Sequence, residues 1–112
     1  MSKLDDLCVK YKANMDKYAI KGVSMKLVTA VAKSLGPSIY NKNAQTVSCG
    51  KQEEKDRVKK NYLIKKLGLE DSPKLDKAIE DVCEKMGKSN RTKHRPIFYA
   101  LLAKKFKKTG MY

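Results

Sequence analysis

The sequence predicts an all-α protein, a compact array of about five helices around a single core. Three observations lead to this fold class. Apolar residues recur at steps of three and four in five segments, which is the spacing of an amphipathic helix. Glycine, proline or a capping residue separates these segments. No stretch shows the alternation typical of a half-buried strand. We therefore interpret residues 1–112 as one helical domain.

The first two predicted helices lie within residues 1–36. Asp5 and Asp6 stand near the start of the first, where the helix dipole favours negative charge. Ser24 is a good N-cap for the second helix, and Gly36-Pro37 is a typical stop for it. The residues expected to form the two buried stripes are Leu4, Leu7, Cys8, Tyr11, Met15 and Tyr18 in the first helix, and Leu27, Val28, Val31 and Leu35 in the second.

A short turn of helix over residues 37–41 and a polar loop over residues 41–50 are expected next. The loop is a candidate functional segment, because loops on a rigid scaffold often carry function. The third helix opens at Glu53 and runs to a stop at Gly68. Its apolar residues cover more than half of the helical wheel, which predicts a central helix with neighbours on two sides.

The last two predicted helices have clearer starts. Ser72-Pro73 is an N-cap followed by proline at the first helical position, and apolar spacing continues from there to Gly87. Pro96 is tolerated only near a helix start, so the last helix begins between Thr92 and Arg95 or is kinked at an earlier turn.

The charge of the chain is its strongest compositional feature. It has 26 lysine and arginine residues against 12 aspartate and glutamate residues, a net charge of +14. Such a field attracts nucleic acid, anionic lipid or acidic proteins, although a charged surface can also serve solubility alone. Residues 89–112 contain seven basic residues and no acidic one. The candidate nucleic-acid contacts on this basic C-terminal helix are Lys88, Arg91, Lys93, Arg95, Lys104, Lys105 and Lys108.

A helix that ends at Leu67-Gly68-Leu69 and a second that begins after Ser72 also resemble a helix-turn-helix, in which the second helix would enter the major groove. That helix carries Asp76, Glu80, Asp81 and Glu84, whose carboxylates would face a polyanion. An antiparallel helix pair is therefore the favoured interpretation.

The sequence offers no legible cofactor, metal or catalytic site. Cys8, Cys49 and Cys83 are odd in number and far apart, which argues against a disulfide framework or a zinc site and favours reduced thiols in a cytoplasm. No export signal or membrane span is expected. Cys49 has two readings, a reactive loop thiol or a small buried apolar residue, and burial is favoured. His94, the single histidine, is expected at the surface or at a helix cap.

Several segments together resemble a family of short bacterial proteins, the domain of unknown function family 2853. The resemblance covers nearly the whole chain, and its most specific pieces are residues 36–41 (GPSIYN) and 88–91 (KSNR). It implies an all-helical cytoplasmic fold and brings no activity, ligand or catalytic residue. Pro96 departs from this family, which has an ordinary helix-forming residue there, and the lysine excess exceeds what the family pattern requires.

These observations favour a small non-enzymatic binding or interaction module. Nucleic acid or an acidic protein is the expected partner, through the basic C-terminal helix. The alternative is a protein-interaction or oligomeric structural protein without a nucleic-acid role. An enzyme or redox protein that uses Cys49 is the least favoured reading.

Overall fold

The computed structural model describes residues 3–41, 45–88, 90 and 92–112. Its α-helices are α1 (Lys3–Lys17), α2 (Met25–Leu35), α3 (Gln52–Val58), α4 (Pro73–Met86) and α5 (Arg95–Lys105). A 3-10 turn, η1 (Gly36–Tyr40), follows α2. A π-helical segment, η2 (Lys59–Lys66), continues α3, and a second 3-10 turn, η3 (Thr109–Met111), lies near the C-terminus. These elements enclose one hydrophobic cluster, so the predicted all-α fold with a single core is confirmed.

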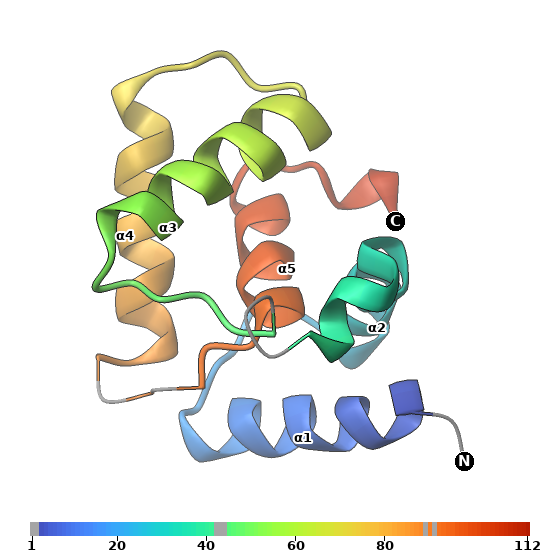
Figure 1. Ribbon diagram of the computed structural model, residues 1–112. Helices are drawn as coiled ribbons and strands as arrows, with labels where there is room; N and C mark the ends of the chain where they lie inside the picture. Colours follow the sequence, from blue (N-terminus) through green and yellow to red (C-terminus); the bar gives the residue numbers. More distant parts are fainter. Residues whose placement is uncertain (1–2, 42–44, 89, 91) are drawn as a thin grey trace.

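The central element is α5 (Figure 1). Every residue from Pro96 to Ala103 is buried, and α2 and α4 both pack against this helix. Figure 1 shows α5 between α4 and α2, with α1 lying across one end of the molecule. The prediction that the third helix would be the central one is therefore wrong. Seven basic residues lie on the two sides of the apolar middle of α5 within residues 89–112. The sequence of this segment therefore did not indicate that the helix is central.

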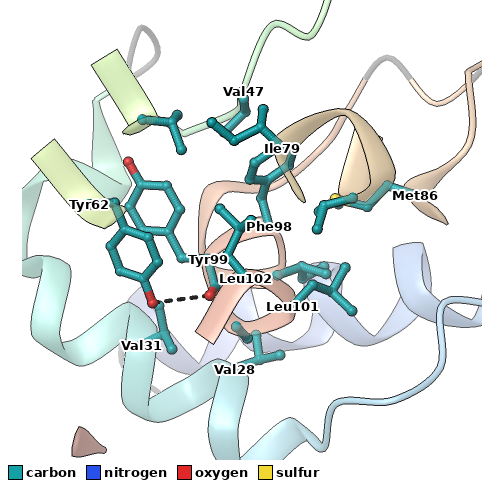
Figure 2. Close-up of a cluster of buried hydrophobic side chains, with 14 of the residues drawn as sticks. Val28, Val31, Val47, Tyr62, Ile79, Met86, Phe98, Tyr99, Leu101 and Leu102 are labelled. Carbon is teal, nitrogen blue, oxygen red and sulfur yellow. Dashed lines mark hydrogen bonds between the residues drawn. The ribbon is translucent and has the colours of Figure 1, made fainter. Parts of the chain in front are cut away.

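The core forms around the apolar stretch of α5 (Figure 2). Phe98 and Leu102 are fully buried, and Val28 of α2 and Ile79 of α4 reach them from neighbouring helices. Full burial of a side chain of this size contributes about 1.5 to 3 kcal/mol. Among the described helices, α5 contributes the most buried residues, eight against six in α4.

Local sequence signals place the helix ends. The Ser24 hydroxyl accepts a hydrogen bond from the Leu27 amide at 3.2 Å, which confirms the predicted N-cap of α2. Gly36 ends that helix at a φ of +66°, a conformation that favours glycine. Pro73 opens α4, and α5 begins at Arg95 with Pro96 in its first turn, as the proline predicts.

The third predicted helix changes its geometry halfway. From Lys59 the turns widen to a π-helix, in which, for example, the Leu67 amide donates to the Tyr62 carbonyl at 2.9 Å. Val58, Tyr62, Leu63 and Leu67 are all buried, at steps of four and five along the chain. The apolar residues that cover too much of an α-helical wheel thus lie on one side of a wider helix.

Cys49 and Cys83 form a disulfide, which corrects the prediction of reduced thiols. The S–S distance is 2.07 Å and the Cα–Cα distance is 6.1 Å across 34 residues. Cys8 is the free cysteine. Neither reading of Cys49, a reactive thiol or a buried free one, is correct. The pair was missed because the fold alone brings the loop before α3 beside α4. Disulfides are rare in cytoplasmic proteins, so the cytoplasmic location stays a prediction.

Helix lengths bear on membrane insertion. Among the described residues, α1 has 15 residues, and α3 together with η2 also has 15 (7 and 8), whereas a span takes about 20 apolar residues. In the part of the chain that the structure describes, no helix is long and apolar enough to cross a membrane.

The disulfide gives a testable prediction. Thiol titration of the unfolded, unreduced protein should find one thiol, and reduction should raise this to three, because Cys8 alone is unpaired. Replacing both Cys49 and Cys83 with serine should lower the free energy of unfolding by about 2 to 4 kcal/mol, since the link restricts the unfolded chain. The measurement is urea denaturation, with Cys8→Ser as the control. Three thiols before reduction would contradict the pairing.

Candidate functional site

The predicted basic residues do not lie on one face. Eight residues, all of them buried, separate Arg95 from Lys104, and the two lie about 14 Å apart along the helix axis. Lys88, Lys104 and Lys105 are exposed, and Lys108 is partly exposed. Arg91 lies outside the described residues. The basic C-terminal helix is therefore basic only at its two ends.

Lys93 points into the protein. It is 8% exposed, and its ammonium donates a hydrogen bond to the Asn90 carbonyl at 2.7 Å. Burial lowers its pKa. Asn90 is fully buried, and it donates to the Asn14 side-chain oxygen of α1 at 3.1 Å and to the Met86 carbonyl at 3.0 Å. Lys93 is thus part of the interior that joins the loop before α5 to α1 and α4.

Arg95 is the polar centre of the interior. Its guanidinium pairs with the Glu54 carboxylate of α3 and donates to the Tyr99 hydroxyl at 2.7 Å and to the Thr46 carbonyl at 3.2 Å. The Arg95 and Glu54 side chains are only 12% and 11% exposed. Burial alone would lower the pKa of Arg95, but Tyr99 and Glu54 together raise it, so the charged form is secure.

Lys93 and Arg95 therefore have structural partners, and their placement does not support contact with a phosphate. Nucleic-acid contact through these two residues stays a prediction. The sequence does not show the structural role of Lys93 and Arg95. Their partners, Asn90 and Glu54, become apparent only when the fold brings α3 beside the loop before α5.

Lys104 and Lys105 line a groove at the other end of α5. Two adjoining hollows, of about 480 Å³ and 160 Å³, share Gly22 and Lys104 in their walls. Ser24 at the start of α2 lines the larger hollow, and Lys85 of α4 lines the smaller one. We call this region the basic groove. Its polar members are Ser24, Asp81, Lys85, Lys104, Lys105 and Thr109.

The charge in the basic groove is only partly balanced. Lys105 pairs with Asp81 at 3.2 Å. Within the described residues, Lys85 and Lys104 have no ion-pair partner. The Lys85 ammonium lies 3.1 Å from the point where a Cβ atom at Gly22 would sit, so this glycine leaves room for the cation. In the described part of the chain, two unpaired cations therefore lie beside the N-terminus of α2, whose dipole has the same sign.

His94 occupies the N-cap position of α5 without a side-chain capping bond. Its ring packs edge-on against Tyr11 of α1, with 5.0 Å between ring centroids. Burial first, and then the charge of Lys10, lower its pKa below 6.5. The predicted cap position is confirmed, but the ring is half-buried rather than on the surface.

The described residues contain no group of three histidine, cysteine, aspartate or glutamate side chains that could hold a metal ion. The cysteine sulfurs that might have served as ligands are joined in the disulfide, apart from Cys8.

Glu54 provides a test of the buried ion pair. Glu54→Gln should lower the free energy of unfolding by about 2 kcal/mol, because Arg95 would keep a buried charge without its counter-ion. Chemical denaturation measures this value. Glu53→Gln, an exposed neighbour on the same helix, should change it by less than about 0.5 kcal/mol. Equal effects for the two variants would show that the pair is not buried.

His94 gives a second prediction, for pH. The NMR titration of the single imidazole should have its midpoint below 6.5, because the pocket disfavours the charged ring. The unfolded chain then binds the proton first, so this residue's contribution to stability is complete above pH 6.5 and is lost as pH falls through the lower folded-state value. A midpoint at or above 6.5 would contradict the burial of the ring.

A comparison with models of protein families gives a match. A search of the curated proteins finds no relative. The family model described as "Protein of unknown function (DUF2853)" matches residues 10–110, which is nearly the whole chain and includes the second half of α1 and all of α2 to α5. The chain therefore belongs to this family of proteins of unknown function, as the resemblance of its sequence indicated.

Proposed function

We propose that this protein is a non-enzymatic binding module that contacts the phosphates of nucleic acid through the basic groove. The observation that carries the proposal is the position of Lys104. It lines both hollows of the groove, beside Lys85 and without an ion-pair partner among the described residues. Unpaired cations at a concave surface are the usual means of binding a phosphate backbone.

Two further features support this proposal. The N-terminus of α2 adds amide groups and a positive dipole end to the same groove. The net charge of +14 draws any polyanion toward the protein before contact. Lys93 and Arg95 are not among the proposed contacts. The proposed surface is the basic groove, where α2, α4 and α5 meet.

The same groove argues for a particular kind of recognition. Lysine ammonium groups contact phosphates as point charges and read no base sequence. Asp81, the acidic residue of the groove, forms an ion pair with Lys105. Binding should therefore depend strongly on salt and weakly on sequence.

A protein-interaction or oligomeric role is the alternative. Interfaces of that kind are usually marked by contiguous apolar surface. The large exposed apolar side chains of the described residues are Val9, Tyr40 and Met111, which belong to three different elements, α1, η1 and η3. No specific observation favours this alternative over the basic groove.

Fluorescence anisotropy of labelled DNA duplexes, titrated at several salt concentrations, tests the proposal. Changing Lys85, Lys104 and Lys105 together to glutamine should weaken binding at least about tenfold. It should also reduce the slope of log affinity against log salt by about 2 to 3, since each phosphate contact contributes about 0.9.

The matched control carries the same loss of charge elsewhere. Lys12, Lys51 and Lys74 are exposed and lie outside the groove, and their change to glutamine should leave the slope nearly unaltered. Equal losses in both triple variants would mean that net charge alone attracts DNA. Absence of binding by the wild type near physiological salt would overturn the proposal.

A further inference from the structure

Another pocket, separate from the basic groove, lies against α1. It has a volume of about 450 Å³, within the range of small-molecule sites. One wall is a single face of α1, and the other comes from two loop segments, residues 45–46 and 92–94. None of its lining residues belongs to the basic groove. We call it the α1 pocket.

The loop wall of the α1 pocket is built firmly. Thr46 and His94 form an isolated antiparallel bridge. Beside it, the Val47 amide donates to the Lys93 carbonyl at 2.9 Å, and the Arg95 amide donates to the Gln45 carbonyl at 2.8 Å. A wall held by main-chain hydrogen bonds from both sides keeps its shape without a ligand.

The floor is a satisfied polar network. Asn14 of α1, which is 8% exposed, donates to the Asn90 side-chain oxygen at 3.3 Å and to the Thr92 hydroxyl at 3.1 Å. These bonds clamp α1 to the second loop segment. The pocket is therefore a fixed feature of the fold and not a gap between loosely packed helices.

The α1 wall combines apolar surface with two cations. Leu7, Lys10, Tyr11, Asn14 and Lys17 follow one another at helical spacing and share this face. Leu7 and Tyr11 give it an apolar end. Lys10 and Lys17 stand two turns apart, about 10 Å along the axis.

The charge of the pocket is one-sided. None of its described lining residues is acidic. Within residues 3–41, 45–88, 90 and 92–112, neither Lys10 nor Lys17 has an ion-pair partner, although the Lys17 ammonium rests over the ring of Tyr18 at 5.5 Å. Lys12, on another face of the same helix, does pair with Asp16. Two cations without an ion-pair partner among the described residues thus line the side of α1 that carries the pocket.

From these observations we infer that the α1 pocket binds a small organic anion, one with an acidic group for Lys10 or Lys17 and an apolar body for Leu7 and Tyr11. Thr46, Thr92 and His94 supply hydrogen-bonding groups on the facing wall. An uncharged molecule of the same shape would lose the attraction of both ammonium groups. An inorganic anion would leave the apolar end of the pocket unfilled.

A matched pair of fluorescent probes tests this inference. Anilinonaphthalenesulfonate has an acidic group on an apolar body, and N-phenylnaphthylamine is the same body without the acidic group. We expect the sulfonate to bind at one site per chain and at least about tenfold more tightly than the amine. Changing both Lys10 and Lys17 to glutamine should weaken binding of the sulfonate about tenfold, as the loss of two exposed charge contacts implies, and should leave binding of the amine unchanged.

Two more variants separate the pocket from general surface charge. Ala13→Phe places a ring at the pocket wall without altering the charge, and it should weaken both probes. Changing Lys12 and Lys33, which are exposed and outside the pocket, to glutamine should have little effect on the affinity for either probe.

Three results would overturn the inference. They are equal affinity for both probes, equal losses in the Lys10/Lys17 and Lys12/Lys33 variants, and sulfonate binding that Ala13→Phe leaves intact. Because the basic-groove variants keep the α1 pocket, failure here leaves the nucleic-acid proposal untouched, and the reverse also holds.

Discussion

The buried contact between Arg95 and Glu54 is the constraint on which much of this structure depends. Arg95 is the first residue of the central helix, and Glu54 belongs to the helix that must fold back over it. The guanidinium also donates a hydrogen bond to the Thr46 carbonyl, so one side chain fixes three segments at once. Since a charge of this kind is costly to bury alone, the three segments are coupled.

The coupling continues along the interior through a row of tyrosines. The Arg95 guanidinium bonds to the Tyr99 hydroxyl, and the Tyr99 ring stacks on Tyr62 with 3.9 Å between centroids. The Tyr62 hydroxyl donates to the Tyr99 carbonyl at 3.0 Å and hydrogen-bonds the Tyr112 hydroxyl at 2.9 Å. Figure 2 shows Tyr62 and Tyr99 side by side, with the hydrogen bond from the Tyr62 hydroxyl to the Tyr99 carbonyl. The π-helical segment that carries Tyr62 and the C-terminal residue are thereby tied to α5.

Sequence reasoning recovered what local physics determines and missed what depends on distant partners. Ser24 and Pro96 mark helix starts because caps and proline act within one turn. The pairing of Cys49 with Cys83 and the buried role of Arg95 depend on residues more than 30 positions away, and neither has a local signature. In the candidate site, Lys104 is exposed, and its contact with nucleic acid stays a prediction. Its neighbour Lys85 lies on a helix that was set aside because its sequence is acidic.

The Arg95–Glu54 contact is tested most directly by amide hydrogen exchange in Glu54→Gln, with Glu53→Gln as the control. The Val47 and Arg95 amides, which hold the loop wall to the segment before α5, should lose more protection than the Leu102 amide in the middle of α5. This result would show that the ion pair holds the loop across the end of α5. An equal change at all three amides, or none, would contradict the account.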